Sequence, residues 1–292
     1  MIRALLHENL SNHKMRAKSA IAAILLILIP LTGSCSINST PAAPKPLPGA
    51  HAHNDYEHDL PLLDALDHGF TSVEADIHLV NGDLCVAHGP AEITPERTLR
   101  SLYLEPLSTH IARNGGRVYP NGPQFTLFID IKTEAVATYK VLSEMLAGYE
   151  SIFTTFDSNG RTDKAVIAIV SGNRPRSLME AQAIRYAGYD GRLVDLDYNV
   201  PVTLIPIISD NWTMHFSYDG TGPMPAEERR KLKNIVETAH KKGRRIRFWA
   251  TPDQPTPARQ TLWQELLTAS VDLINTDDLP GLQKFLLKNT PK

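Results

Sequence analysis

Short apolar segments alternate with segments whose apolar residues recur at helical spacing along most of the chain after residue 48. Apolar runs of strand length between amphipathic helices are typical of a parallel sheet covered by helices. The pattern predicts eight strands, at residues 49–53, 72–79, 124–131, 165–170, 192–196, 203–208, 244–249 and 271–275. It predicts helices at residues 60–68, 134–147, 177–184, 226–242, 257–268 and 279–288.

The number and order of these segments predict the fold. Eight strands in regular alternation with helices favour a closed (β/α)8 TIM barrel over an open doubly wound sheet, and no repeat of solenoid length is visible. Residues 49–292 are therefore assigned to one α/β domain, which has the usual size of such a barrel. In a TIM barrel the side chains that perform chemistry lie at the carboxyl ends of the strands.

The first 35 residues are expected to be a signal peptide. Lys14, Arg16 and Lys18 precede an apolar run at residues 20–31, which is shorter than a helix that spans a bilayer. Small residues then lead to Cys35, a pattern typical of a bacterial lipoprotein cleavage site, so we expect Cys35 to carry lipid. Residues 36–48 contain four prolines and no periodic apolar pattern, and they are interpreted as a tether between membrane and barrel.

These features predict an exported protein that is anchored to the outer membrane or the cell surface through its N-terminal lipid. Ordinary cleavage near Ser34 is the alternative, and it would release the protein into the periplasm or the medium. Met15 would itself begin a well-proportioned signal peptide, so the sequence leaves the true start open.

The overall charge gives little reason to expect a macromolecular partner. The chain has 30 basic and 32 acidic residues, and the formal net charge of −2 argues against a nucleic-acid or polybasic membrane contact. Most of the basic run from Lys231 to Arg247 falls on a predicted helix and the turn after it, and the run is interpreted as a solvated face. Cys85 is the only cysteine besides Cys35, so it is expected to pack in a strand rather than to form a disulfide. We expect a monomer.

Three carboxylates in predicted strands indicate a metal site. Glu74 and Asp76 lie two residues apart in one strand and therefore point to the same face, and Asp130 lies near the end of the next strand. Carboxylates that converge without an equal set of cations would repel one another, whereas a divalent ion neutralises them. Oxygen ligands of this kind suit Mg²⁺ or Ca²⁺. Buried salt bridges are the alternative interpretation of the same residues.

Two histidines are candidates for general acid and base catalysis. His53 ends the first predicted strand and His88 follows the second, and imidazole gives and takes protons near neutral pH. Catalysis of this kind needs one group to take a proton from the attacking oxygen and another to give a proton to the leaving oxygen. The sequence leaves open which histidine has which role. His51 shares a strand face with His53, and it is interpreted as a supporting partner or an additional ligand.

The order of these residues resembles the phosphatidylinositol-specific phospholipase C-like phosphodiesterase superfamily, and within it the glycerophosphodiester phosphodiesterases. The shared pattern of histidine, E-x-D pair, second histidine and acidic residue with lysine falls on His53, Glu74, Asp76, His88, Asp130 and Lys132. The HNDY segment at residues 53–56 is most similar to the altered-inheritance-of-mitochondria 6 branch. The resemblance implies a TIM barrel that hydrolyses phosphodiesters with a divalent metal. The chain departs from the superfamily at Asn54, in place of an arginine, and at Gly89, in place of an aspartate.

Three further residues are candidates for substrate binding. Lys132 shares a strand face with Asp130, and it is expected to neutralise a phosphate oxygen or to balance the acidic cluster. Asn54 either contacts the metal or a phosphate oxygen or forms a turn. Trp249 resembles a tryptophan that the superfamily places near the barrel mouth, where it packs against substrate or against the core. Asp277 is not assigned to substrate binding: it resembles an aspartate of the superfamily's last strand, and otherwise it caps the last helix.

The leading hypothesis is an exported metal-dependent phosphodiesterase that acts on a small or lipid-derived phosphodiester through His53 and His88. The alternative is a non-catalytic barrel that kept the metal pocket and binds a ligand. A third hypothesis is a metal-dependent hydrolase of another type, since the barrel alone does not fix function. The identity of the substrate, the choice between Mg²⁺ and Ca²⁺, and hydrolysis as against cyclic phosphate formation stay open.

Overall fold

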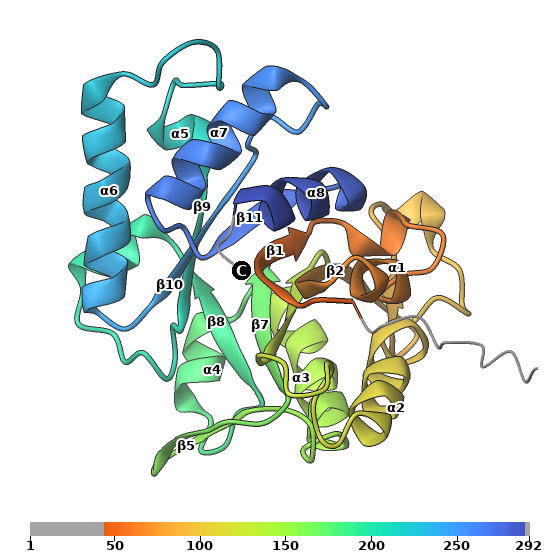
Figure 1. Ribbon diagram of the computed structural model, residues 1–292. Coiled ribbons are helices and arrows are strands. Elements are labelled where there is room, and N and C mark those ends of the chain that lie inside the picture. The colour runs from red at the N-terminus through yellow and green to blue at the C-terminus, as the bar shows by residue number, and fades with distance from the viewer. Residues whose placement is uncertain (1–43, 290–292) are drawn as a thin grey trace, which may run out of the picture. The chain divides into compact units, whose positions relative to one another are not determined.

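The computed structural model describes residues 44–289, and in them eight parallel strands form the centre of the fold (Figure 1). These strands are β1 (Leu47–Ala52), β2 (Phe70–Val80), β4 (Phe125–Ile131), β7 (Val166–Gly172), β8 (Ala187–Gly191), β9 (Ile207–Asn211), β10 (Arg245–Trp249) and β11 (Leu273–Thr276). Hydrogen-bonded neighbours follow the order β1, β11, β10, β9, β8, β7, β4 and β2, and β1 also pairs with β2. The sheet therefore closes on itself, which confirms the predicted TIM barrel.

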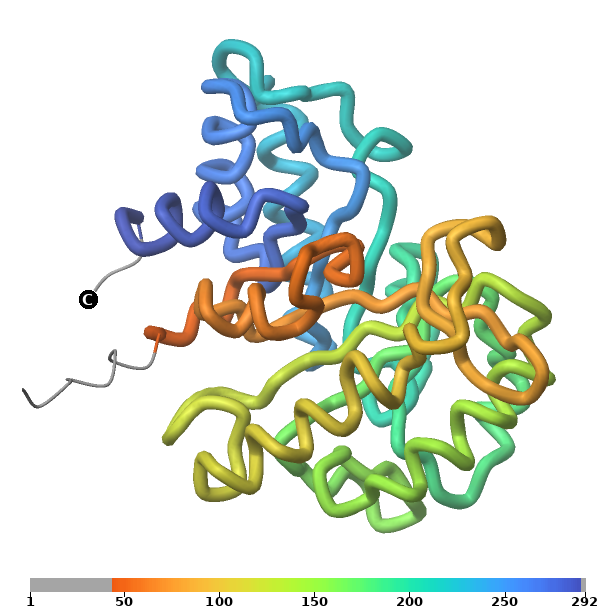
Figure 2. Tube along the Cα trace, turned by 90° about the vertical axis from the view of Figure 1, so that its right-hand side faces the viewer, coloured from red at the N-terminus to blue at the C-terminus, as the bar shows by residue number. Residues whose placement is uncertain are grey.

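Helices surround the strands in Figure 1. They are α1 (Leu63–Asp67), α2 (Glu105–Arg113), α3 (Ala135–Ala147), α4 (Arg176–Ala181), α5 (Trp212–His215), α6 (Ala226–Lys241), α7 (Pro257–Thr268) and α8 (Leu279–Asn289). Single helical turns add η1 (Asp55–Glu57), η2 (Pro90–Glu92), η3 (Arg100–Leu104) and η4 (Leu193–Asp197). Strand β3 (Asp83–Val86) pairs antiparallel with the end of β2, and β5 (Thr155–Asp157) forms a hairpin with β6 (Gly160–Thr162). The first strand and the last helix lie side by side (Figure 2).

The side chains of β2 alternate between two environments. Val73, Ala75 and Ile77 are fully buried in the main apolar core, so Glu74 and Asp76 point to the opposite side, into the barrel. A smaller apolar cluster contains the register partner of Glu74 and consists of Phe128, Phe156, Ile167, Ile169, Ile207 and Leu273. The barrel therefore combines an apolar interior layer with carboxylates close to its mouth.

One of the predicted strands is wrong. No strand forms at residues 192–196: Leu193–Asp197 is the helical turn η4, and the fifth parallel strand, β8, ends at Gly191. Two glycines lower the strand propensity of β8, but the packing requires them. A Cβ atom on Gly188 would lie 2.6 Å from Pro206 Cγ, and one on Gly191 would lie 2.5 Å from Ile205 Cγ2. Close packing against the chain before β9 thus overrides the local propensity.

Other elements differ from the prediction mainly at their ends. The sixth strand begins at Ile207 rather than at residue 203, and α2, β3, α5 and the hairpin of β5 and β6 were not predicted. Helix α6 matches its prediction closely, and Gly243 follows it with a φ of +70°. No helix within residues 44–289 is long and apolar enough to cross a membrane. The predicted signal peptide, Cys35 and most of the predicted tether lie outside the described residues.

Candidate functional site

Three acidic side chains meet at the carboxyl end of the barrel strands. Glu74 and Asp76 come from β2 and Asp130 comes from the neighbouring β4, where it is the register partner of Asp76. One oxygen atom from each side chain lies within 4.8 Å of the others. The structure therefore brings together the three predicted metal ligands in a group that is able to hold a metal ion.

The two oxygens of the buried Asp76 carboxylate have different surroundings. Oδ2 accepts a hydrogen bond from Tyr56 Oη at 2.7 Å and lies 3.0 Å from Lys132 Nζ. Oδ1 is buried and has no hydrogen-bond partner among the described residues. Burial raises the pKa of Asp76 to about 6, although the charge of Lys132 opposes the change. A buried carboxylate oxygen without a partner is costly, and a bound cation would satisfy it.

Asp130 fits into space that a glycine leaves open. Gly172 ends β7 with a φ of +66°, in the left-handed region that favours glycine. A Cβ atom at Gly172 would lie 2.2 Å from Asp130 Oδ1, so a larger residue would displace the carboxylate. Lys132 Nζ lies 3.1 Å from the same oxygen. Burial raises the pKa of Asp130, and the charge of Glu74 raises it further. Gly172 was not predicted as a site residue, and its only signal is a glycine that ends an apolar run.

Glu74 is paired with Arg247, a buried residue at the end of the basic run that was predicted to face solvent. Arg247 on β10 is 3% exposed, and its Nη1 lies 2.5 Å from Glu74 Oε2. Its guanidinium carbon lies 4.3 Å from the centre of the Phe128 ring. The interpretation of Arg247 as part of a solvated face is therefore wrong. Burial alone would raise the pKa of Glu74, but the charge of Arg247 and the contact with His51 hold it well below its usual value.

His51 is a neutral part of the barrel interior. Its Nδ1 lies 2.7 Å from Ser72 Oγ, and its Nε2 lies 3.2 Å from Glu74 Oε2 and also contacts Arg247. Burial and the charge of Arg247 lower the pKa of His51 to about 3. The side chain is fully buried and uncharged at neutral pH. This environment favours a supporting role beside Glu74 over proton exchange with a substrate.

His53 lies at the barrel mouth and is oriented by a carboxylate from the opposite end of the chain. Its Nδ1 donates a hydrogen bond to Asp277 Oδ1 at 2.8 Å. Burial alone would lower the pKa of His53, but Asp277 raises it above its usual value. Asp278, rather than Asp277, accepts the hydrogen bond from the Gly281 amide at the start of α8. With Nδ1 occupied, Nε2 is the atom of His53 that is available for proton transfer.

His88 lies in the loop after β3, and Tyr56 links it to the carboxylates. Its side chain is 59% exposed, and its Nδ1 lies 3.6 Å from Asp76 Oδ2. Burial and the charge of Asp76 raise the pKa of Tyr56 far above its usual value, so the phenol stays protonated and donates a hydrogen bond to Asp76. Tyr56 Oη then accepts a hydrogen bond from His88 Nδ1 at 3.1 Å. Tyr56 also contacts Asn54 Oδ1 at 3.0 Å.

A pocket of about 430 Å³ opens above the carboxylates. The candidate residues His53, Glu74, Asp130, Lys132 and Trp249 line it, and the further lining residues are Ile131, Ser171, Gly172, Asn173, Arg192 and Arg247. One of the two candidate histidines, two of the three carboxylates and two of the three candidate substrate-binding side chains thus share one cavity, whereas Asp76, His88 and Asn54 do not line it.

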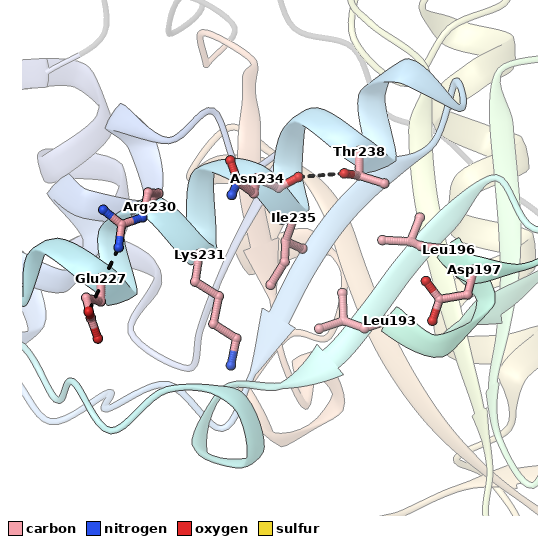
Figure 3. A pocket seen from close by; sticks show the side chains of 9 residues that line it. All are labelled: Leu193, Leu196, Asp197, Glu227, Arg230, Lys231, Asn234, Ile235 and Thr238. Carbon is pink, nitrogen blue, oxygen red and sulfur yellow. Dashed lines mark hydrogen bonds and ion pairs between the residues drawn. The ribbon is translucent and has the colours of Figure 1, made fainter.

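The remaining candidates lie apart from that pocket. Asn54 has left-handed backbone angles and contacts Tyr56, and it is absent from the pocket lining. His78 follows Asp76 by two residues in β2, and it is buried and contacts the Ala87 carbonyl oxygen at 3.1 Å. A second pocket of about 420 Å³ lies between η4 and α6 (Figure 3). It shares no lining residue with the mouth pocket and contains none of the candidate site residues, so the acidic cluster marks the better candidate active site.

The AIM6-like phosphodiesterase domain family matches residues 43–190, which is about half of the chain. The chain therefore belongs to this family of phosphodiesterase-like domains, as the resemblance in the sequence implied. It is similar to altered inheritance of mitochondria protein 6 of Eremothecium gossypii, with 29% identity over 266 residues that cover 80% of this chain and 68% of the relative. It is also similar to the homolog of that protein in Arthroderma benhamiae, with 28% identity over 269 residues that cover 82% and 84%.

Among solved structures, a glycerophosphoryl diester phosphodiesterase from Parabacteroides distasonis aligns with a TM-score of 0.49 and 13% sequence identity. The alignment covers 86% of this chain and 90% of that structure.

Proposed function

We propose that the protein is a metal-dependent phosphoric diester hydrolase that acts on a small or lipid-derived phosphodiester. The observation that carries the proposal is Oδ1 of Asp76, which is buried in a group of three carboxylates and has no hydrogen-bond partner among residues 44–289. Membership of the AIM6-like phosphodiesterase domain family supports the same reaction class.

Glu74, Asp76 and Asp130 would hold the metal ion, and their oxygens suit Mg²⁺ or Ca²⁺. The bound cation would stabilise the negative charge that develops on the phosphoryl oxygens in the transition state. Lys132 lies within 3.1 Å of two of these carboxylates and is 31% exposed, so it neutralises part of their charge and reaches a nonbridging phosphate oxygen.

His53 and His88 would divide the general acid and base roles. A water oxygen attacks phosphorus while the P–O bond to the leaving alcohol breaks. One histidine takes the proton of the water, and the other gives a proton to the leaving oxygen. Asp277 favours the charged form of His53 and fixes its ring, whereas Tyr56 orients His88. A hydroxyl group of the substrate in the place of water would give a cyclic phosphate.

The proposed enzyme is exported and carries lipid at Cys35, in the outer membrane or at the cell surface. The basic residues, the apolar run at residues 20–31 and the small residues before Cys35 support this location. A lipid anchor would hold the barrel near lipid-derived phosphodiesters.

The test is hydrolysis of bis(4-nitrophenyl) phosphate by the purified protein, with 4-nitrophenyl phosphate as the matched monoester. We expect diester hydrolysis that EDTA abolishes and added Mg²⁺ or Ca²⁺ restores. Asp76→Asn should lose the activity, whereas Glu227→Gln should keep it because the Glu227 side chain is 91% exposed on α6. A protein that binds the metal but hydrolyses neither ester would favour the alternative of a non-catalytic binding barrel.

A further inference from the structure

The mouth pocket contains an arginine that the proposed reaction does not use. Arg192 directly follows β8 and lines the same cavity as Glu74 and Asp130. In the barrel order β4 and β7 lie between β2 and β8, so Arg192 lies across the mouth from Glu74. Trp249 lies at the end of β10, which is separated from β8 by β9 alone, and it lines the pocket on the same side as Arg192. The pocket therefore has a half with carboxylates and a half with an arginine and an indole.

The guanidinium of Arg192 is held in place through one nitrogen atom. Nη1 lies 2.9 Å from Asp190 Oδ2, 3.0 Å from the Ser209 carbonyl oxygen and 3.1 Å from the Gly191 carbonyl oxygen. Asp190 is fully buried, and its Oδ2 also accepts a hydrogen bond from Ser171 Oγ at 2.9 Å. Three acceptors thus fix the position of the side chain before any ligand binds.

The other edge of this guanidinium is open. Nε and Nη2 of Arg192 make no hydrogen bond to any residue between 44 and 289, and the side chain is 26% exposed. By contrast, Arg229 uses Nε and Nη2 in a paired contact with Glu265. The edge formed by Nε and Nη2 is the part of a guanidinium that binds carboxylate and phosphate groups through two parallel hydrogen bonds.

We propose that Arg192 forms a subsite for a second anionic group of the substrate, a carboxylate or a phosphate carried by one of the two alcohols of the phosphodiester. The inference rests on the proposed diesterase function. Asp190 is fully buried and pairs with Nη1, so an anion bound at the edge formed by Nε and Nη2 does not contact this carboxylate. Trp249 provides an apolar wall for the carbon atoms between the two anionic groups.

The test uses four 4-nitrophenyl phosphodiesters whose second alcohol is ethanol, choline, 3-hydroxypropanoate or ethylene glycol monophosphate. Wild type should prefer the carboxylate or the phosphate ester over the ethyl ester by about tenfold or more in kcat/KM, because charge-assisted hydrogen bonds are strong. The two anionic esters distinguish the two sources of charge, and the choline ester should gain nothing. Arg192→Gln should lose the preference, and Arg192→Lys should keep only part of it, since lysine retains a charge beside Asp190 but not the fork.

The matched control is Arg230→Gln, which should leave the preference unchanged. Arg230 lies on α6 with a side chain that is 69% exposed and 4.0 Å from Glu227 (Figure 3). A wild type without preference for an anionic ester, or a preference that survives in Arg192→Gln, would overturn the subsite while the diesterase function stands.

A wild type that hydrolyses none of the four esters would instead contradict the proposed function. The subsite is then judged by calorimetric binding of 3-phosphonopropionate and of ethylphosphonate. We expect tighter binding of 3-phosphonopropionate to wild type and loss of that difference in Arg192→Gln. Equal binding of the two probes to wild type would reject the subsite.

Discussion

Substitution of Gly172 by alanine should abolish metal binding while the barrel stays folded. Gly172 has a φ of +66°, and a Cβ atom there would lie 2.2 Å from Asp130 Oδ1 and 2.5 Å from the Ile131 carbonyl oxygen. The Ile131 carbonyl is backbone inside β4 and cannot easily move. The Asp130 side chain can rotate away and would then leave the acidic cluster, whereas the clash with the Ile131 carbonyl requires a shift of the backbone at residue 172.

The loss of folding stability expected for Gly172→Ala has two separate sources. An L-residue in the left-handed region costs roughly 1–2 kcal/mol, and insertion of an extra methyl group into packed structure typically costs about 1–3 kcal/mol. Most domains are stable by about 5–15 kcal/mol, so Gly172→Ala should remain folded. Metal at a hundred times its Kd should stabilise wild type by about 2.7 kcal/mol, and this gain should disappear in the variant.

Gly222→Ala is the matched control. Gly222 has a φ of +68°, and a Cβ atom there would meet nothing within 4 Å. Gly222→Ala therefore carries only the cost of a left-handed backbone, and it should keep the full stabilisation by metal. Chemical unfolding of both variants and of wild type, with EDTA and with saturating Mg²⁺ or Ca²⁺, measures both quantities. If Gly172→Ala gained as much stability from metal as Gly222→Ala does, Asp130 would not be a ligand and the reasoning would fail.

Three other predictions address catalysis, pH and anchoring. His53→Ala and His88→Ala should each lower diesterase turnover by roughly 10²- to 10⁴-fold, and His58→Ala should have a small effect; equal losses in all three would contradict the assigned roles. Asp55 is fully buried, and burial raises its pKa to about 7, so the folded protein favours the protonated carboxyl. Its contribution to the free energy of unfolding is therefore complete below about pH 4 and is lost as the pH rises through 7. In Asp55→Asn the free energy of unfolding should lose this fall, which amounts to up to about 4 kcal/mol between pH 4 and pH 7. An unchanged fall in the variant would refute this role of Asp55. Cys35→Ala should move the protein from the membrane fraction to the soluble fraction, whereas a wild type found wholly soluble would show that Cys35 carries no lipid.

The parts of the site that the sequence predicted depend on local spacing. Glu74 and Asp76 share a strand face because strand side chains alternate, and Asp130 ends the neighbouring parallel strand. Parallel strands bring their carboxyl ends to one mouth, so the fold prediction already places these groups together. The closed order of the strands was predictable for the same reason, since alternation with helices extends along the whole barrel.

The parts that were missed depend on contacts between distant segments. Arg247 lies in a basic stretch that is typical of a surface, and only its pairing with Glu74, 173 residues away, places it inside the barrel. Asp277 was noted in the sequence, but its contact with His53 spans 224 residues and was not predicted. Strand β8 was missed because its two glycines serve packing against the chain before β9, and packing leaves no mark in strand propensity.

The central claim is that Glu74, Asp76 and Asp130 hold a divalent cation at the barrel mouth. A crystal structure of the protein grown with Mn²⁺, with anomalous data collected at the manganese edge, tests this claim most directly. We predict one anomalous peak bound by an oxygen from each of the three carboxylates, including Oδ1 of Asp76, and loss of that peak in Asp76→Asn crystals. A cluster without a peak, with Asp76 Oδ1 bonded to protein or water alone, would contradict the account.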